Sequence, residues 1–310
     1  MASKFIKTIL ALLVFILTFV NLIEAQNRSN AYRVDTFTPT SAPSLELRTS
    51  GGSLEVIGHD EHEIIIETYV RRGSRYLDTS DTDLSDFDLE IYQDGDLVRA
   101  EAIRDGSGFS FLRSSRNISI SFRAYVPVHT EVKGSTSGGS VSARNLMNDI
   151  DLRTSGGSVN VVNIHGNAVV RTSGGGITIE DFAGMIEART SGGSISVDGL
   201  EGVGDLRTSG GGIRLENIAA RLDARTSGGS IRANLLSLYD DVNLQTSGGS
   251  IRIDLHGATD FELNLRGNRV NTQLRNFSGE FENNRIVGKI GDGGPQVSAR
   301  TSGGSVSLNY

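Results

Sequence analysis

One stretch decides the fold: Ala188-Arg189-Thr190-Ser191-Gly192-Gly193-Ser194-Ile195-Ser196-Val197. Its Thr-Ser-Gly-Gly core occurs nine times in the 310-residue chain, each time followed by Ser or Gly and then by Leu, Val or Ile. The copies begin at Thr49, Thr136, Thr154, Thr172, Thr190, Thr208, Thr226, Thr246 and Thr301. From Thr136 to Thr226 the copies are 18 residues apart, and the next step is 20. Such a fixed period is typical of a solenoid.

Apolar residues alternate with polar ones on both sides of each glycine pair. Counted from the threonine, positions −4, −2, +5, +7 and +10 of the seven copies from Thr136 to Thr246 are apolar in 32 of 35 cases. The exceptions are Gly134, Gly204 and His256. A period of two indicates strands, whereas a helix would need a period of 3.6. We therefore predict an all-β, single-stranded β-solenoid with about 18 residues per coil, in which a sharp corner joins two strands.

The glycine pairs are predicted to form the corner of every coil. Glycine permits positive φ, and the next coil lies only about 4.8 Å away, so a side chain there would meet its own copy. The inward threonines are expected to stack beside the corner and to satisfy their hydroxyls between coils. The predicted corner glycines are Gly138, Gly139, Gly156, Gly157, Gly174, Gly175, Gly192, Gly193, Gly210, Gly211, Gly228, Gly229, Gly248, Gly249, Gly303 and Gly304.

Outward positions carry two sets of arginines. Most arginines just before the threonines follow a carboxylate two residues earlier, which favours solvated ladders of alternating sign. The alternative is a surface that binds an extended polyanion such as a glycan, and its candidate residues are Arg153, Arg171, Arg189, Arg207 and Arg225. Beyond the corner, Arg214, Arg232 and Arg252 precede Glu216, Asn234 and Asp254 in the same way.

The chain before and after the regular array is less repetitive. Residues 26–130 are predicted to form a β-rich entry and cap, with a first coil at residues 44–57 and a hairpin turn at Asp94-Gly95. Residues 131–310 are predicted to be regular solenoid. The gap between Thr246 and Thr301 has room for three degenerate coils. The last repeat is expected to leave an open strand edge around Ser305 and Ser307, shielded by Tyr310, by self-association or by a partner.

The first 25 residues predict export. Lys4 and Lys7 precede a largely apolar run of 12 residues from Ile9 to Val20, and a small residue, Ala25, marks the expected cleavage point. An uncleaved anchor is the alternative, but a helix needs about 20 apolar residues to span a bilayer. We expect the mature chain in the periplasm, on the outer surface or outside the cell.

Composition excludes several classes of protein. The chain has no cysteine, so disulfides, thiolate metal sites, cysteine nucleophiles and lipid-modified cysteines are all absent. A net charge of −7 argues against nucleic acid as a partner, because a phosphate backbone calls for a basic surface. No cofactor is expected.

The repeated Thr-Ser-Gly-Gly-Ser-Ile strands, the Val126-Pro127 segment before Thr136 and the irregular β entry resemble the bacterial "putative-adhesin" family of unknown function, which is similar to auto-transporter adhesin head domains. The resemblance covers nearly the whole mature chain. It implies a right-handed single-stranded parallel β-helix, and adhesion by name alone. It supplies no binding residues, and this chain has no recognisable translocation barrel.

These features favour a non-catalytic interaction protein of the cell envelope, an adhesin or a scaffold, whose ligand is a glycan or an envelope protein. The alternative is a carbohydrate-active β-helix enzyme such as a polysaccharide lyase or hydrolase. Enzyme sites need acids and bases that interrupt a repeat, whereas carboxylates recur in nearly every coil here. The turn His59–Glu63 matches no metal-binding spacing. The acidic run Asp78, Asp81, Asp83, Asp86 and Asp88 lacks the glycine and glutamate of a calcium loop.

Overall fold

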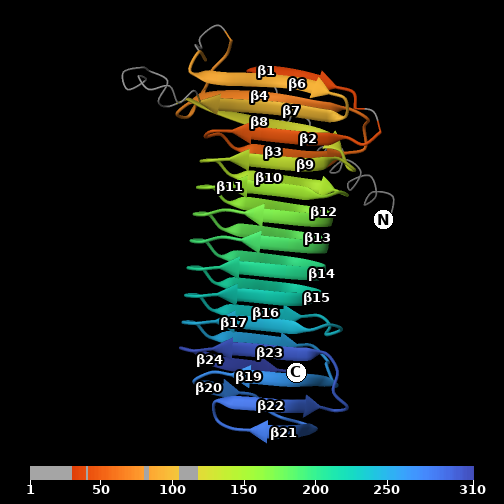
Figure 1. Cartoon of the computed structure of the whole chain (residues 1–310), viewed down its shortest axis with the longest axis vertical. Helices are drawn as coiled ribbons and strands as arrows, with labels where there is room; N and C mark the ends of the chain where they lie inside the picture. Colours follow the sequence, from red (N-terminus) through yellow and green to blue (C-terminus); the bar gives the residue numbers. More distant parts are fainter. Residues whose placement is uncertain (1–29, 40, 80–83, 105–117) are drawn as a thin grey trace, which may run out of the picture.

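The computed structural model describes residues 30–39, 41–79, 84–104 and 118–310, so the predicted signal peptide lies outside the described residues. The described part is all β: its 24 strands join into one continuous sheet, and none of its residues lies in an α-helix. The strands run perpendicular to the long axis of a tall column and stack along that axis (Figure 1). Within these ranges no helix is long and apolar enough to cross a membrane. The predicted all-β solenoid is confirmed.

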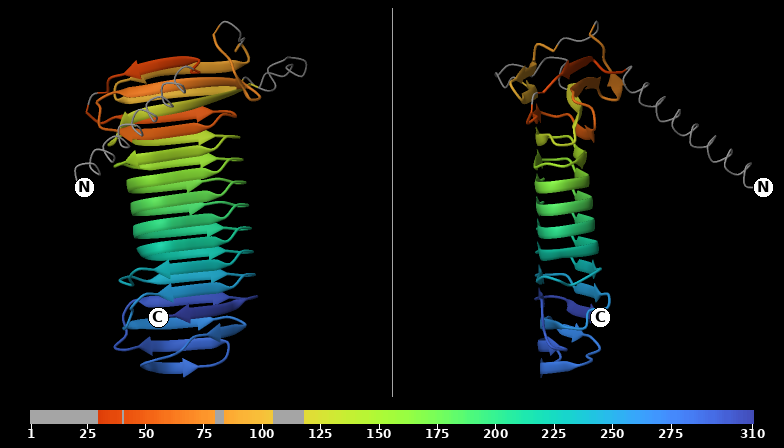
Figure 2. Two further views of the ribbon diagram at one scale, coloured as in Figure 1. Left: turned by 180° about the vertical axis from the view of Figure 1, so that it is seen from behind. Right: turned by 90° about the vertical axis from the view of Figure 1, so that its right-hand side faces the viewer.

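Each regular coil contributes to two layers of parallel strands, which Figure 2 shows edge-on. We call the layer before each glycine pair the first face and the layer after it the second face. The separate strands of the central body are β9 (Glu131–Thr136), β10 (Val141–Leu146), β11 (Ile150–Thr154), β16 (Ile231–Leu235), β17 (Val242–Thr246) and β18 (Ile251–Leu255). Four longer strands pass through the second face, bend and continue into the first face of the next coil: β12 (Val159–Arg171), β13 (Ile177–Arg189), β14 (Ile195–Thr208) and β15 (Ile213–Thr226).

Equivalent residues of successive coils lie directly above one another. Val159, Ile177, Ile195, Ile213 and Ile231 form one in-register column of the second face. Together with the inward residues of the first face they fill the interior, and all five are almost fully buried. Because one face of every strand points into this narrow core, the 18-residue pattern fixes the register over the whole stack.

The buried threonine column beside the corner is held by hydrogen bonds between coils. The Thr190 hydroxyl donates to the carbonyl oxygen of Gly175 at 2.8 Å and accepts the backbone N–H of Gly193 at 3.3 Å. The same bond to the preceding coil recurs at Thr136, Thr154, Thr172, Thr208, Thr226, Thr246 and Thr301. The hydroxyls are therefore satisfied between coils, as predicted, but by glycine carbonyls.

The corner glycines are needed for a different reason than a positive φ, which neither Gly192 nor Gly193 adopts. The backbone carbonyl of the preceding coil lies too close to leave room for a side chain. A Cβ atom on Gly193 would lie 2.1 Å from the carbonyl oxygen of Gly175, whereas one on Gly192 would lie 3.2 Å from that of Gly174. The expectation of positive φ at this corner was therefore wrong, and the second glycine of each pair is the sterically critical one.

Left-handed backbone occurs instead at the opposite edge of the coil. Asn145, Asn163, Asp181 and Asn217 have φ values between 52° and 58°, and Gly199 occupies the same position with φ 77°. Asparagine, aspartate and glycine tolerate this conformation best. The Asn163 side-chain amide also donates to the Asn145 side-chain oxygen at 2.9 Å. The sequence pattern does not predict this second corner.

In the coils of Thr226 and Thr246, the last inward residue lies one position earlier than in the regular coils. The pairing of β15 with β16 shifts register after Leu215, and Ile218 lies opposite Leu235. Leu235 and Leu255 are therefore buried, while Leu236 and His256, at position +10, are exposed. The assignment of Leu236 to the core was wrong because this coil lacks the left-handed residue that precedes position +10 in the earlier ones.

The N-terminal end has a stacking order that differs from the order of the chain. It comprises β1 (Arg33–Phe37), β2 (Ser44–Thr49), β3 (Leu54–His59), β4 (Ile64–Arg72), β5 (Arg75–Tyr76), β6 (Phe87–Asp94), β7 (Leu97–Arg104) and β8 (Ile118–Pro127). The coil of β2 and β3 lies between β7 and β9 on one face and between β8 and β10 on the other. Outside it, antiparallel pairing of β6 with β7, β4 with β8 and β1 with β4 ends the solenoid. The predicted hairpin at Asp94-Gly95 is confirmed.

The C-terminal end repeats this arrangement with β19 (Phe261–Arg266), β20 (Arg269–Asn271), β21 (Phe277–Phe281), β22 (Arg285–Ile290), β23 (Gln296–Thr301) and β24 (Ser305–Asn309). The last Thr-Ser-Gly-Gly coil is inserted into the stack. Strand β23 pairs with β17 and β19, and β24 pairs with β18 and β20. Figure 1 accordingly marks the C-terminus inside the column, with β22 and β21 beyond it.

Two predictions for this region were therefore wrong. The gap between Thr246 and Thr301 holds one coil, β19 with β20, and an antiparallel pair, β21 with β22, instead of three degenerate coils. The edge around Ser305 and Ser307 is not open, because β24 has a partner on both sides. Tyr310 packs edge-on against Phe261, with ring centroids 5.1 Å apart. Self-association through β24 loses its structural basis.

Candidate functional site

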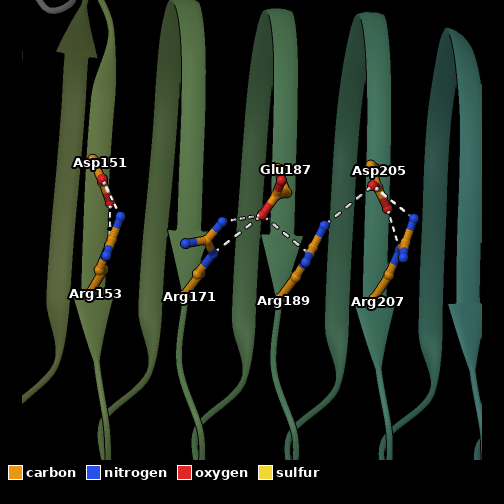
Figure 3. Close-up of polar contacts among 7 residues, drawn as sticks. All are labelled: Asp151, Arg153, Arg171, Glu187, Arg189, Asp205 and Arg207. Atoms are coloured by element: carbon orange, nitrogen blue, oxygen red, sulfur yellow. Dashed lines mark hydrogen bonds and ion pairs between the residues drawn. The ribbon is translucent and has the colours of Figure 1, made fainter.

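The arginines of the first face are paired with carboxylates along the column. Arg153 lies 2.7 Å from Asp151, and Arg207 lies 2.8 Å from Asp205. Figure 3 shows the first contact as a separate pair and the second as the end of a chain that begins at Arg171. Hydrogen bonds to these carboxylates raise the pKa of both guanidinium groups. The remaining contacts are Arg171 with Glu187 at 2.6 Å, Arg189 with Glu187 at 3.1 Å and with Asp205 at 3.7 Å, and Arg225 with Asp223 at 2.6 Å.

This pairing compensates the charge of the column that sequence analysis offered as a candidate binding surface. Glu187 contacts arginines of two successive coils, because the first-face strand of Arg171 carries Val169 where the others have an acid. Each guanidinium remains partly exposed, yet a ligand anion would have to displace a carboxylate already in place. The geometry of the first face thus favours the structural reading, an ionic ladder that sets register.

The second face carries arginines that are not compensated in this way. Arg214, Arg232 and Arg252 occupy one in-register column on β15, β16 and β18, and all three side chains are exposed. Arg214 contacts Glu216 at 3.2 Å. For Arg232 and Arg252, the described residues provide no ion pair.

The missing partners have identifiable causes. Asn234, two residues after Arg232, carries no charge. Asp254, two residues after Arg252, instead accepts a hydrogen bond from the side-chain amide of Asn309 in the inserted coil. The prediction that these arginines pair like those of the first face was therefore correct for Arg214 alone.

A groove of about 540 Å³ runs along this part of the second face, parallel to the column axis. One wall follows the corner and consists of Ser194, Gly212, Ser230, Ser250 and Ser305. The other wall consists of Ser196, Arg214, Arg232, Arg252 and Ser307. Buried isoleucines form the floor between them. The groove thus spans five stacked coils, and its described lining includes no carboxylate.

The serines of the corner wall are held in a fixed orientation by the backbone. The hydroxyl oxygens of Ser194, Ser230 and Ser250 accept backbone N–H groups of the next coil at 3.1 to 3.2 Å. A serine hydroxyl has one proton and can accept as well as donate. Because its oxygen is already oriented, each of these hydroxyls can still donate toward the groove.

The groove continues into a second hollow of about 680 Å³ toward the C-terminal end, and the two share Arg252 and Ser307. This hollow exists where the short strand β20 covers only part of β24. Its lining adds Arg275, the single carboxylate Asp254 and Thr272, whose buried hydroxyl has no hydrogen-bond partner among the described residues. The Tyr310 hydroxyl accepts the backbone N–H of Arg275 at 2.7 Å, which holds this wall in place.

We call the two hollows together the arginine groove. Its lining contains four arginines and one aspartate, whereas the whole chain has 30 Lys and Arg against 37 Asp and Glu. Local positive charge on an acidic protein therefore concentrates here. The groove could not be predicted from the sequence because Asn309, which binds Asp254, lies 55 residues away from it along the chain.

Metal binding finds no support in the described residues. Nowhere in those ranges do three or more His, Asp or Glu side chains form a group that could hold a metal ion. His59 ends β3, and its Nδ1 accepts the backbone N–H of Glu61 at 3.0 Å, so the residues from His59 to Glu63 form a polar turn. Asp81 and Asp83 of the acidic run lie outside the described residues.

Two solved structures are similar: a "putative cell adhesion protein" from Clostridium sporogenes (12% identity, TM-score 0.25, covering 89% of this chain and 97% of that one) and a "putative adhesin" from Bacteroides fragilis (12% identity, TM-score 0.44, covering 89% and 96%). No curated protein matches. The family model Toastrack DUF4097 matches residues 22–309, nearly the whole chain. The chain therefore belongs to the Toastrack DUF4097 family.

Proposed function

We propose that this protein is an exported, non-catalytic interaction protein of the cell envelope that binds an anionic ligand through the arginine groove. One observation carries the proposal: Arg232 and Arg252 stack in a groove without carboxylate partners, while the first-face arginines from Arg153 to Arg225 have them. Stacked like charges repel each other, so an uncompensated column costs stability unless an anion relieves it.

The composition of the groove supports binding over hydrolysis. Hydrolysis of a glycosidic bond commonly uses two acidic groups on opposite sides of the bond. The described lining of the arginine groove has Asp254 as its one carboxylate, and that side chain is held by Asn309. A hydrolase that acted here would need a second acidic group that the described walls do not supply.

Export rests on the sequence of residues 1–25, which precede the described residues. The fold suits an extracellular setting, because its many hydrogen bonds between coils need no disulfide to hold them. We expect the mature protein to begin at Gln26, and N-terminal sequencing of the chain recovered from an envelope or culture fraction tests this directly. An N-terminus at Met1 in a membrane fraction would contradict it.

The functional test is a glycan-array screen of the mature chain, run beside a reducing-sugar release assay on every polymer that binds. We expect binding to anionic polymers without product formation. The double variant Arg232→Gln/Arg252→Gln should lose that binding. Turnover of a bound polymer would favour the enzyme class, and binding that survives in the double variant would remove the groove from the proposal.

A further inference from the structure

We propose, on the basis of the function above, that the ligand of the arginine groove is an acidic polysaccharide whose chain lies parallel to the long axis of the column. Its carboxylates would bind Arg232 and Arg252, which have no ion pair among the described residues, and would take the place of Glu216 at Arg214. Its hydroxyls would meet the serine wall.

The direction of the ligand follows from the stacking. Arg214 lies opposite Arg232 and Arg232 lies opposite Arg252 in the parallel registers, so the guanidinium groups repeat at the strand spacing of about 4.8 Å. A ligand that crossed the column would meet one of these arginines, whereas a ligand along the axis meets all three. Five coils span about 19 Å at this spacing, which suits several units of a linear polymer.

The chemistry of the two walls selects the class of polymer. Guanidinium groups bind carboxylates with two parallel hydrogen bonds, so the arginine wall fits a polymer with a regularly repeated acid. The opposite wall presents the hydroxyls of Ser194, Ser230 and Ser250, each fixed by a backbone N–H. Hydroxyls in four of the five coils of this wall match a ligand that is rich in hydroxyl groups, which is the character of a sugar chain.

Other extended anions fit less well. Single-stranded nucleic acid is bound through aromatic side chains on which bases stack, and Tyr310, at one end, is the sole aromatic residue in the described lining. An acidic peptide bound along a sheet face gains affinity from pockets for its side chains. Here the floor is closed by buried isoleucines, one wall consists of serines and a glycine, and the other carries a run of three arginines, so no pocket for a peptide side chain is present in the described lining.

The test uses the mature protein with fragments of polygalacturonate of increasing length, measured by titration calorimetry. The matched ligand is the methyl ester of the same polymer, which keeps the sugar backbone and loses the charge. The matched protein is Arg189→Gln/Arg207→Gln, which removes the same two charges from the first face. Thermal melting of both double variants checks that each is folded.

We expect affinity to rise with fragment length until the fragment spans the groove, and the methyl ester to bind at least tenfold more weakly. The groove variant Arg232→Gln/Arg252→Gln should lose tenfold or more in affinity, and the first-face variant less than twofold. Equal binding of the methyl ester, or equal losses in the two variants, overturns the proposal.

Two further outcomes separate this inference from the proposed function. If polygalacturonate does not bind but a phosphate-bearing envelope polymer binds through Arg232 and Arg252, the acidic polysaccharide is refuted and the groove remains a binding site. If the wild type binds no anionic polymer at all, both proposals fall.

Discussion

Replacing Gly193 with alanine should destabilise the solenoid far more than the same change at its neighbour Gly192. The added Cβ would lie 2.1 Å from the carbonyl oxygen of Gly175, and an ordinary C···O contact is about 3.4 Å, so the coils must separate locally by about 1.3 Å. That movement breaks the hydrogen bond of 2.8 Å from Thr190 to the same carbonyl and strains the bond of 2.9 Å from Gly192 to Ser173.

The broken and the strained hydrogen bond together cost about 1–2 kcal/mol, and a buried acceptor left without a donor costs about 1–3 kcal/mol. Alanine restricts the unfolded chain and returns about 0.4–1 kcal/mol. The net loss in the free energy of unfolding for Gly193→Ala is therefore about 2–4 kcal/mol. Gly192→Ala, with its Cβ at 3.2 Å from Gly174, should cost less than about 1 kcal/mol, because a shift of a few tenths of an ångström relieves the contact.

Urea denaturation of both variants, followed by circular dichroism, measures this difference. Because every coil has the same corner, the comparison can be repeated with Gly210 and Gly211 as an internal replicate. If the two alanine variants of one corner are equally stable, the close approach of coils is not the reason for the second glycine.

Three further outcomes are expected. Asn163→Ala should cost about 1–2 kcal/mol because alanine disfavours the left-handed backbone, while Asn163→Gly should cost clearly less in the same thermal melt; equal costs would show that backbone conformation is not the cause. Arg189→Ala should change the free energy of unfolding by less than about 1 kcal/mol because its ion pairs are exposed, and a larger loss in urea denaturation would contradict the ladder reading. Hydrogen bonds from the Thr259 hydroxyl and the Asp292 backbone N–H lower the pKa of Asp260 below its ordinary 3.8, so its contribution to stability is complete at neutral pH and is lost as the pH falls through the lowered value. The difference in Tm between wild type and Asp260→Asn should therefore shrink only in acid, and a difference that already shrinks near neutral pH would refute the assignment.

The regular coils could be predicted from sequence because their causes act within one period. The inward positions, including Leu45, Leu47, Leu54 and Val56 of the first coil, follow from alternation and are buried as predicted. The corner was located correctly even though its glycines serve close approach and not positive φ. The predictions for the regular coils, both the correct ones and the wrong one, depend only on a residue and on its equivalent 18 positions away.

The ends and the groove could not be predicted because they depend on pairing between distant coils. Every Thr-Ser-Gly-Gly coil offers the same backbone groups for pairing. The local sequence therefore does not show that the coil of Thr301 lies between the coil of Thr246 and β19. The groove could not be predicted for the same reason, because it forms where the inserted coil pairs with β18. Arg252 and Asp254 have the spacing of a paired ladder, and only the inserted coil brings Asn309 to Asp254.

The inserted coils also determine how the column can come apart. In a simple repeat protein each repeat touches only its neighbours in sequence, so the outermost one can fray alone. Here the coil of β23 and β24 lies between residues 242–255 and residues 261–271, and that of β2 and β3 is enclosed in the same way. Unfolding from an end begins with the antiparallel cap. Once that cap is removed at the C-terminal end, the exposed coil is paired with an inserted coil and not with the coil that precedes it in sequence. Each end must therefore fold and unfold as a block of several coils, closed by contacts between residues 34 to 87 positions apart, which makes closure of the ends slow and their loosening rare.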